Sequence, residues 1–327
     1  MRDDSSTPST GADAEEARRL AARARDPWLT KKPRERVSRH GLEGEVLARS
    51  ARGDGRHVVL KIALDGVPAV LKLYGRKRDW LKDTLRDVGH RWFLGKTGMT
   101  PHARWATERE TLALWRAHGF DVPAELPLPL PSAVPPLRLL SEFVPGQPLY
   151  LAVEHATLPL AEKERLIRWV AADWSRRHDL ALQLVEPRLV QSHAMLAHVF
   201  HVAPGAQGAG SPERLVTFDF EVAWARRSAL PRLVSLEIAQ LFDSIARWAP
   251  LDHIGPLIAA FVRGYPSRER LERIERDVLR GRLPLFGWLS RLGLQLRERG
   301  ARRKLAVLAH LEAALATQSR DETERRA

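Results

Sequence analysis

The chain has 327 residues, of which 44% are hydrophobic and none is cysteine, and its formal net charge is +13. This length allows one large domain or two small ones with a real core, and the lack of cysteine excludes disulfides, thiolate catalysis and thiolate metal sites. No apolar run approaches the roughly 18 residues of a spanning helix, and the N-terminus is polar and acidic. We therefore expect a soluble, cytoplasmic protein.

The positive charge predicts an anionic partner, such as nucleic acid, an acidic lipid surface or phosphate groups. Much of the excess is local, because residues 72–104 hold nine lysines and arginines against three aspartates. A second basic stretch covers residues 263–304. The alternative is that such runs are solvated helix faces in an arginine-rich chain, and the sign of the charge does not choose between these interpretations.

The first 39 residues lack the large apolar side chains that a core needs, so we expect a disordered or loosely helical tail over residues 1–39. Residues 41–74 then alternate in polarity and contain tight-turn sequences at residues 53–55 and 65–66. This pattern predicts three antiparallel strands in a meander, with Lys72 in the third.

A helix is predicted for residues 105–118. Its apolar stripe contains Trp105, Leu112 and Trp115, and Glu108 falls within the same stripe. Burying an ionised carboxylate is costly unless it is paired, so Glu108 requires a basic partner beneath the helix. The alternative is a glutamate at the edge of the stripe that reaches water.

A proline-rich segment, residues 123–136, separates this helix from a strand predicted for residues 137–144. Beyond that strand, helical periodicity is found in residues 159–177, 233–248, 253–264, 267–280 and 285–316. The sequence therefore predicts an α+β protein, in which a small antiparallel sheet with one helix, residues 40–146, precedes a larger helical part, residues 147–327.

The order of these elements resembles the two-lobed protein-kinase-like fold, which carries a lysine on a sheet strand and a glutamate on the following helix. Within that fold the chain resembles the bacterial lipopolysaccharide core heptose kinases and Kdo kinases. Their catalytic loop reads His-Arg-Asp-x-Tyr-x-x-His-Phe, and a second aspartate follows after a strand. The matching stretches are Gln191-Ser-His-Ala-Met-Leu-Ala-His-Val-Phe200 and Leu215-Val-Thr-Phe-Asp-Phe-Glu221. The resemblance covers roughly residues 41–244.

This resemblance implies an ATP-dependent phosphotransferase that uses Mg²⁺, because phosphoryl transfer depends on positioning and on charge stabilisation. By match, Lys72 binds the α- and β-phosphates and Glu108 orients it. Asp219 and His198 are implied as ligands of Mg²⁺, and Glu142 lies where the last sheet strand would contact the nucleotide.

The chain departs from the family at the proton acceptor, since His193 stands where the family carries aspartate and Gln191 stands where its loop begins with histidine. General-base catalysis is typically worth about 10²–10⁴-fold, and a neutral imidazole accepts a proton near its unperturbed pKa of about 6.5. His193 is therefore a candidate proton acceptor, and the departure implies an activity that is either altered or absent.

Simpler interpretations of these residues stay open. Lys72 could face solvent, as we expect of Lys61 in the neighbouring strand. The histidines His193, His198 and His201 could form a zinc site with the nearby aspartate. Against this, His198 and His201 have opposite parity in a strand-forming segment and should point to opposite faces.

Two further motifs are assigned structural roles. The tripeptide Arg177-His178-Asp179 resembles a catalytic motif, but it ends a helical run well upstream of the strand-like residues 197–202, so we reject it as the catalytic loop. Glu237 matches a helix carboxylate that braces the catalytic loop in kinases. Its alternative is an acid near a helix N-terminus, which the helix dipole favours.

The leading hypothesis is an ATP-dependent kinase that phosphorylates a sugar hydroxyl of lipopolysaccharide core or a related glycolipid at the inner membrane. A second is a pseudokinase that binds nucleotide or a partner and acts in regulation. A nucleic-acid binder ranks last, because the sequence lacks a groove-reading motif and an aromatic RNA-stacking pattern. Residues 285–304 join apolar and basic residues, as in an interfacial membrane segment, although core packing is the favoured explanation of the apolar ones, because a helical lobe needs such faces.

Overall fold

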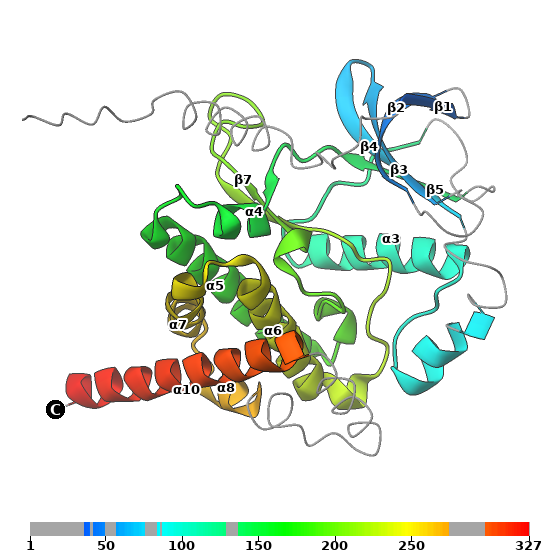
Figure 1. Cartoon of the computed structure of the whole chain (residues 1–327). Coiled ribbons are helices and arrows are strands. Elements are labelled where there is room, and N and C mark those ends of the chain that lie inside the picture. Colours follow the sequence, from blue (N-terminus) through cyan, green and yellow to red (C-terminus); the bar gives the residue numbers. More distant parts are fainter. Residues whose placement is uncertain are drawn as a thin grey trace, which may run out of the picture.

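The computed structural model describes residues 36–39, 42–49, 57–75, 84–85, 87–128, 137–274 and 298–326. These residues form two lobes, an antiparallel sheet with one helix and a larger helical part (Figure 1). A small hydrophobic core surrounds Leu60 and Leu71 in the sheet, and a large one surrounds Trp174 and Phe242 among the helices and extends to Trp115 and Leu139 of the sheet lobe. The predicted two-lobed α+β architecture is confirmed.

The main sheet of the described residues is antiparallel throughout, and its spatial order follows the sequence: β1 (Arg36–Arg39), β2 (Leu42–Arg49), β3 (Val58–Leu64), β4 (Val67–Tyr74) and β5 (Leu137–Glu142). Asp65 and Gly66 have φ of 50° and 81°, the positive values that the tight turn between β3 and β4 requires. The predicted meander is confirmed. The sheet also includes β1, so it begins within the segment that the sequence assigned to the tail.

Helix α3 (Pro101–Ala117) lies below the sheet and contacts β4 and β5 (Figure 1). It begins at Thr100, whose hydroxyl accepts a hydrogen bond from the backbone N–H of Ala103 at 3.2 Å. Trp105 donates its indole N–H to the carbonyl of Arg138 in β5 at 2.9 Å. The helix therefore starts before the predicted residue 105, because the sequence pattern did not include its cap.

The helical lobe contains α4 (Leu149–Glu154), α5 (Leu160–Leu184), α6 (Leu230–Trp248), α7 (Ile254–Gly264), α8 (Arg268–Ile274) and α10 (Glu298–Arg326). Helix α5 continues past the predicted end at residue 177. The predicted helices over residues 267–280 and 285–316, and the predicted interfacial segment, lie partly outside the described residues. None of the described helices combines the length and apolarity that crossing a bilayer requires.

A second, small sheet lies at the junction of the lobes and has the order β6 (Gln147–Pro148), β7 (Val199–Val202) and β8 (Arg214–Thr217). Short turns of helix accompany these elements: η1 (Gly89–Phe93), η2 (Pro187–Leu189), η3 (Leu196–His198), η4 (Arg227–Ala229) and η5 (Leu251–His253). Strands β7 and β8 confirm the predicted strands, which lie between the candidate metal ligands His198 and Asp219 in the chain. The small sheet thus brings the catalytic-loop region next to the linker that follows β5.

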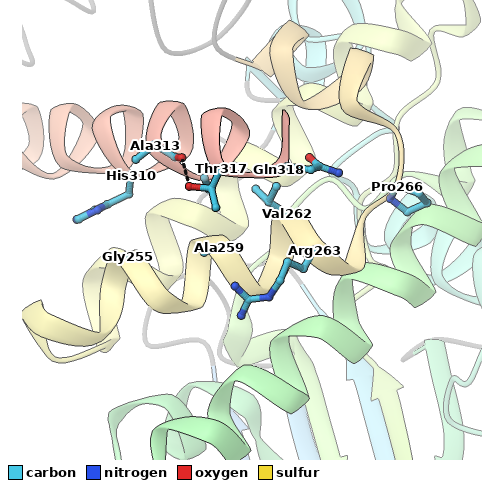
Figure 2. Close-up of a pocket in the computed structure, with 10 residues that line it drawn as sticks. Gly255, Ala259, Val262, Arg263, Pro266, His310, Ala313, Thr317 and Gln318 are labelled. Carbon is cyan, nitrogen blue, oxygen red and sulfur yellow. Dashed lines mark hydrogen bonds between the residues drawn. The ribbon is translucent and has the colours of Figure 1, made fainter. Parts of the chain in front are cut away.

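A groove of about 670 Å³ separates α7 from α10. Figure 2 shows its lining, with Gly255 and Val262 of α7 on the side toward His310 and Thr317 of α10. A Cβ atom on Gly255 would lie 2.9 Å from Nδ1 of His310, so the glycine permits the close approach of the two helices. The groove does not include any residue predicted to act in catalysis.

Candidate active site

Lys72 lies in β4, on the face of the sheet opposite to the residues of that strand that enter the small core. Side chains alternate along a strand, so Leu71 and Leu73 enter the small core while Lys72 and Tyr74 point to the other face, toward α3. The ammonium of Lys72 lies 2.7 Å from Oε2 and 3.0 Å from Oε1 of Glu108. The interpretation of Lys72 as a solvent-facing lysine is therefore wrong.

Glu108 occupies the buried face of α3 and is 6% exposed. Besides Lys72, its carboxylate accepts a hydrogen bond from the hydroxyl of Tyr74. The prediction that this carboxylate has a basic partner beneath the helix is confirmed, and the alternative of a glutamate in water is wrong. Burial raises the pKa of Glu108 and Lys72 opposes that effect, so the pair depends on the lysine remaining charged.

A second carboxylate, which the sequence analysis did not assign to the site, also contacts the lysine. Oε1 of Glu221 lies 2.8 Å from Nζ of Lys72 and 3.3 Å from Nε2 of His57. Its other oxygen lies 3.0 Å from Nη1 of Arg104. Glu221 is 4% exposed, so these partners replace the water that its charge has lost.

Arg104 is the second cation of this cluster and is 1% exposed. It belongs to α3, one helical turn before Glu108, so both side chains leave the same face of the helix. Its Nε donates to the carbonyl of Met99 at 3.2 Å, and Nη2 donates to the carbonyl of Gly75 at the end of β4. The cluster therefore contains two cations, Lys72 and Arg104, and two carboxylates.

The electrostatic balance favours a charged lysine. Burial by itself lowers the pKa of Lys72, but the nearby carboxylates, with Glu108 first and then Glu221 and Asp219, raise it well above the usual range. Lys72 and Glu108 are thus in direct contact, as predicted. The grouping of Asp219 with them stays a prediction, which its small contribution to the raised pKa of Lys72 supports.

Asp219 follows β8 and has φ of 66°, in the left-handed region that non-glycine residues seldom adopt. Backbone conformations of this kind are costly and persist where the surrounding structure holds them. Here Gln191 donates its side-chain N–H to the carbonyl of Phe218 at 2.7 Å, and Phe220 is buried against Trp115. The carboxylate of Asp219 itself is 42% exposed and lies 3.6 Å from Nε2 of His198.

The hydrogen bond at Nδ1 of His198 determines which tautomer of the ring faces Asp219. Nδ1 lies 2.6 Å from the carbonyl oxygen of His193, and because a carbonyl only accepts, Nδ1 carries the proton. In the neutral ring, Nε2 then has a lone pair that faces an oxygen of Asp219. Two acceptors facing each other are stabilised by a cation between them or by a proton on the ring.

His193 lies in the exposed turn between Gln191 and Met195. Its Nδ1 lies 3.2 Å from the hydroxyl of Ser192, and that hydroxyl donates to the carbonyl of Val222 at 2.6 Å. The backbone N–H of Ala194 donates to the side chain of Gln240 at 2.8 Å. The turn is thus held on both sides, and the side chain of His193 is exposed.

A buried network beneath the turn explains its position. Glu237 of α6 accepts the backbone N–H of Gln191 at 3.1 Å and the ring N–H of His178 at 3.0 Å, and it also pairs with Arg177. Burial raises the pKa of Glu237, but Arg177 and His178 outweigh burial and lower it. The structural interpretation of Glu237 is confirmed, and Arg177 and His178 lie inside α5 as its partners.

Glu142 lies at the end of β5, where it contacts a second cluster rather than Lys72. Oε1 of Glu142 lies 3.5 Å from Nη2 of Arg214, and Nε of Arg214 donates to Asp121 at 2.8 Å. A contact of Glu142 with nucleotide stays a prediction. His201 lies 2.6 Å from Glu213, away from His198, and no group of three or more potential metal ligands occurs among the described residues.

No protein-family model and no curated protein matches the sequence. Solved structures that resemble the chain include WaaP in complex with acyl carrier protein, with 15% identity, a TM-score of 0.45 and coverage of 78% of this chain and 90% of that one. They also include vaccinia related kinase 3, with 11% identity, a TM-score of 0.33 and coverage of 83% and 82%. A microcompartment-associated aminopropanol kinase has 14% identity, a TM-score of 0.32 and coverage of 95% and 98%.

The names of two of these three structures describe kinases. Their identities and TM-scores are too low to support an argument about activity or substrate, so the class of the chain is defined by its own geometry. That geometry is a sheet lysine paired with a helix glutamate, and an aspartate after β8 that lies next to His198. The chain has two lobes, a small antiparallel sheet with one helix and a larger helical part, with this arrangement of charges.

Proposed function

We propose that the chain is an ATP-dependent phosphotransferase that acts on a sugar hydroxyl of lipopolysaccharide core or a related glycolipid. The observation that carries the proposal is the position of Lys72, held by Glu108 and acted on by the charge of Asp219. Phosphoryl transfer requires fixed charges more than it requires covalent chemistry from the protein. A charged lysine on a rigid strand and a carboxylate on a held turn supply such charges.

In this proposal Lys72 binds the α- and β-phosphates of ATP, Glu108 holds the lysine in place, and Glu142 contributes to the nucleotide site. The phosphates have to compete with Glu221, which takes the second contact of the lysine. Glu221 remains neutralised when it releases Lys72, because Arg104 and His57 contact it as well. The cluster therefore tolerates an exchange of partners at the lysine.

Mg²⁺ fits the pair formed by Asp219 and His198. The carboxylate is partly exposed, and the ring lone pair that faces it at 3.6 Å is directed by the hydrogen bond at Nδ1. Mg²⁺ is usually bound by one or two carboxylates together with substrate phosphates, so one aspartate and one imidazole form a sufficient protein contribution. When bound, the ion neutralises charge that develops on the transferred phosphoryl group.

His193 is the proposed proton acceptor. Its ring is exposed in the turn whose carbonyl orients His198, so it lies beside the proposed metal ligands. As the acceptor oxygen bonds to the γ-phosphorus and the bond to the bridging oxygen of ADP breaks, the hydroxyl proton passes to the imidazole. The neutral form of His193 is the active one.

The second candidate function is a pseudokinase that binds nucleotide or a protein partner and acts in regulation. Two observations favour it: histidine replaces aspartate at position 193, and Lys72 is already neutralised by two carboxylates. This candidate and the kinase share the fold and the lysine site. They differ in turnover.

A titration of the protein with ATP, with and without Mg²⁺, tests both candidates together, and a radiolabelled assay with lipopolysaccharide core acceptors then separates them. We expect binding that strengthens with Mg²⁺, a labelled product, and loss of the Mg²⁺ effect in Asp219→Asn. The matched control is Asp173→Asn, a surface aspartate that pairs with Arg176. Binding without product assigns the chain to the pseudokinases, and absence of nucleotide binding contradicts both candidates.

A further inference from the structure

An exposed apolar cluster precedes α3. Trp92 and Phe93 are 73% and 76% exposed, and Leu85, Val88 and Leu94 next to them are also largely exposed. We refer to these five residues as the apolar patch. Large apolar side chains that stay in water next to one another mark a contact surface more often than they mark packing. The segment lies, in cyan, at the edge of the molecule below α3 in Figure 1.

The patch is firmly attached to the candidate active site. Beyond it, Thr97 and Gly95 exchange backbone hydrogen bonds with Ala223 and Ala225, at 2.9 and 2.8 Å. Ala223 and Ala225 lie two and four residues after Glu221 in the chain. Lys96 also donates to the carbonyl of Ser192, next to His193, at 3.3 Å. Residues 95–97 therefore connect the apolar patch by hydrogen bonds to the turn that carries His193.

The charges around the patch are positive. Arg91 and Arg226 are exposed, and Arg226 donates to the carbonyl of Trp92. Within residues 84–85 and 87–104 the one acidic residue is Asp87, and its carboxylate is taken by Arg91 at 3.0 Å and by the N–H of Met99. An anionic surface would thus meet exposed aromatic side chains and arginines without an exposed carboxylate among them.

We infer that the apolar patch, with Arg91 and Arg226, docks the protein on an anionic lipid bilayer. Trp and Phe place an apolar ring at the boundary between headgroups and acyl chains, and each nearby cation gains from negative headgroups. The two features together favour lipid over a protein partner, because the aromatic side chains are about three quarters exposed and lie next to arginines that complement anionic headgroups. The inference deepens the proposed function and rests on it for the acceptor, which is a lipid-anchored sugar.

Docking through the apolar patch would explain how a lipid-anchored sugar reaches the candidate active site. With Trp92 and Phe93 at the bilayer, the segment that carries Lys96 brings the turn of His193 toward the same surface. A sugar that projects from the headgroup layer could then reach the imidazole without leaving the membrane. An enzyme with a fully soluble acceptor has no need of an exposed aromatic pair at this position.

Cosedimentation of the full-length protein with vesicles tests the inference. The vesicles consist of phosphatidylcholine alone, or contain about one third phosphatidylglycerol. We expect binding to the anionic vesicles, a partition coefficient about 10- to 100-fold lower for Trp92→Ala/Phe93→Ala, and about fivefold lower for each of Arg91→Ala and Arg226→Ala. The matched control is Leu251→Ala in η5, since Leu251 is 86% exposed and lies in the helical lobe.

Equal binding of the wild type and the double variant to anionic vesicles overturns the inference. Binding to neither kind of vesicle overturns it as well and leaves the patch as a surface for a protein. Vesicle binding does not require ATP, so a protein that binds vesicles through the patch but forms no product keeps the inference and contradicts the proposed function. Nucleotide binding by the double variant, measured alongside, shows that its fold is intact.

Discussion

At the residue scale, the environment of Lys72 determines what its removal costs. Replacement by Met leaves Glu108 with the hydroxyl of Tyr74 alone and Glu221 with Arg104 and His57. Removing one partner of a buried ion pair typically costs about 3–5 kcal/mol, because the remaining charge is left without water. We expect Lys72→Met to lower the free energy of unfolding by this amount in urea titrations.

The double variant Lys72→Met/Glu108→Gln is expected to recover part of that loss, because it removes the unpaired carboxylate. Lys61→Met is the control from the neighbouring strand. Its ammonium lies 4.0 Å above the ring of Phe143 at a partly exposed position, so the cost should stay near 1 kcal/mol. Equal losses for Lys61→Met and Lys72→Met would contradict the charge-cluster account.

The pair of Asp219 and His198 leads to a prediction about the metal. Imidazole nitrogen suits first-row transition metals better than Mg²⁺, which prefers oxygen. We expect Mn²⁺ to support nucleotide binding at lower concentration than Mg²⁺, and His198→Asn to reduce that preference because it replaces nitrogen by an amide oxygen. The measurement is nucleotide affinity as a function of each metal. A preference for Mn²⁺ that is unchanged in His198→Asn would remove His198 from the site.

The role of His193 is tested by substitution and by pH. We expect His193→Ala to lower turnover by about 10²–10⁴-fold and His193→Asp to retain or raise it. The activity of the wild type should fall as the pH decreases below about 6.5, the ordinary pKa of a histidine. In His193→Asp this decline should occur at a lower pH. Product formation that is insensitive to His193→Ala would exclude the base role and preserve the kinase assignment.

At the scale of the elements, the buried contacts of Glu237 in α6 with Arg177 and His178 in α5 determine how the free energy of unfolding changes in acid. The pKa of Glu237 is lowered in the folded protein because Arg177 and His178 outweigh burial, so its contribution is present above about pH 4.3 and is lost as the pH falls through the folded value. Burial lowers the pKa of His178, so the unfolded chain takes up that proton more readily, and stability also falls below about pH 6.5.

We therefore expect the midpoint of thermal unfolding to decrease from about pH 6.5 downward, with a further decrease below about pH 4.3. Glu237→Gln should be less stable at neutral pH by about 3–5 kcal/mol and should lose most of the second decrease. The control is Glu110→Gln, an exposed glutamate near Arg188, which should cost under about 1 kcal/mol. An unchanged acid profile in Glu237→Gln would assign the decrease to other groups.

The elements also show which parts of the site could be read from the sequence. Glu108 was identifiable because it is a carboxylate within the apolar stripe of α3, and Lys72 because it stands where the resemblance places a lysine on a sheet strand. Glu221 was not, since its partner Arg104 is 117 residues away in the chain and no local pattern joins them. The apolar patch was equally hidden, because Trp92 and Phe93 have the composition of core residues and only their exposure distinguishes them.

For the whole molecule, the order of the two lobes followed from the change in hydrophobic period along the chain, but their mutual position did not. The linker after β5 is one connection, with Gly146 beside His201 of β7, where a Cβ atom would lie 2.8 Å from the His201 carbonyl. The other is the charge cluster, in which Glu221 from the helical side is held by Lys72 and Arg104 from the sheet side. Neither contact is local in sequence.

Glu221 therefore bears on how the two lobes unfold. The small core of the sheet is separate from the large core, which includes Trp115 and Leu139 of the sheet lobe as well as the helices, and separate cores can open as separate units unless contacts between them are strong. We expect amides of β4 and of α6 to exchange with solvent at similar free energies in the wild type. In Glu221→Gln the amides of β4 should exchange at a lower free energy than those of α6. Parallel changes in both sets would mean that the linker alone makes the two lobes one cooperative unit.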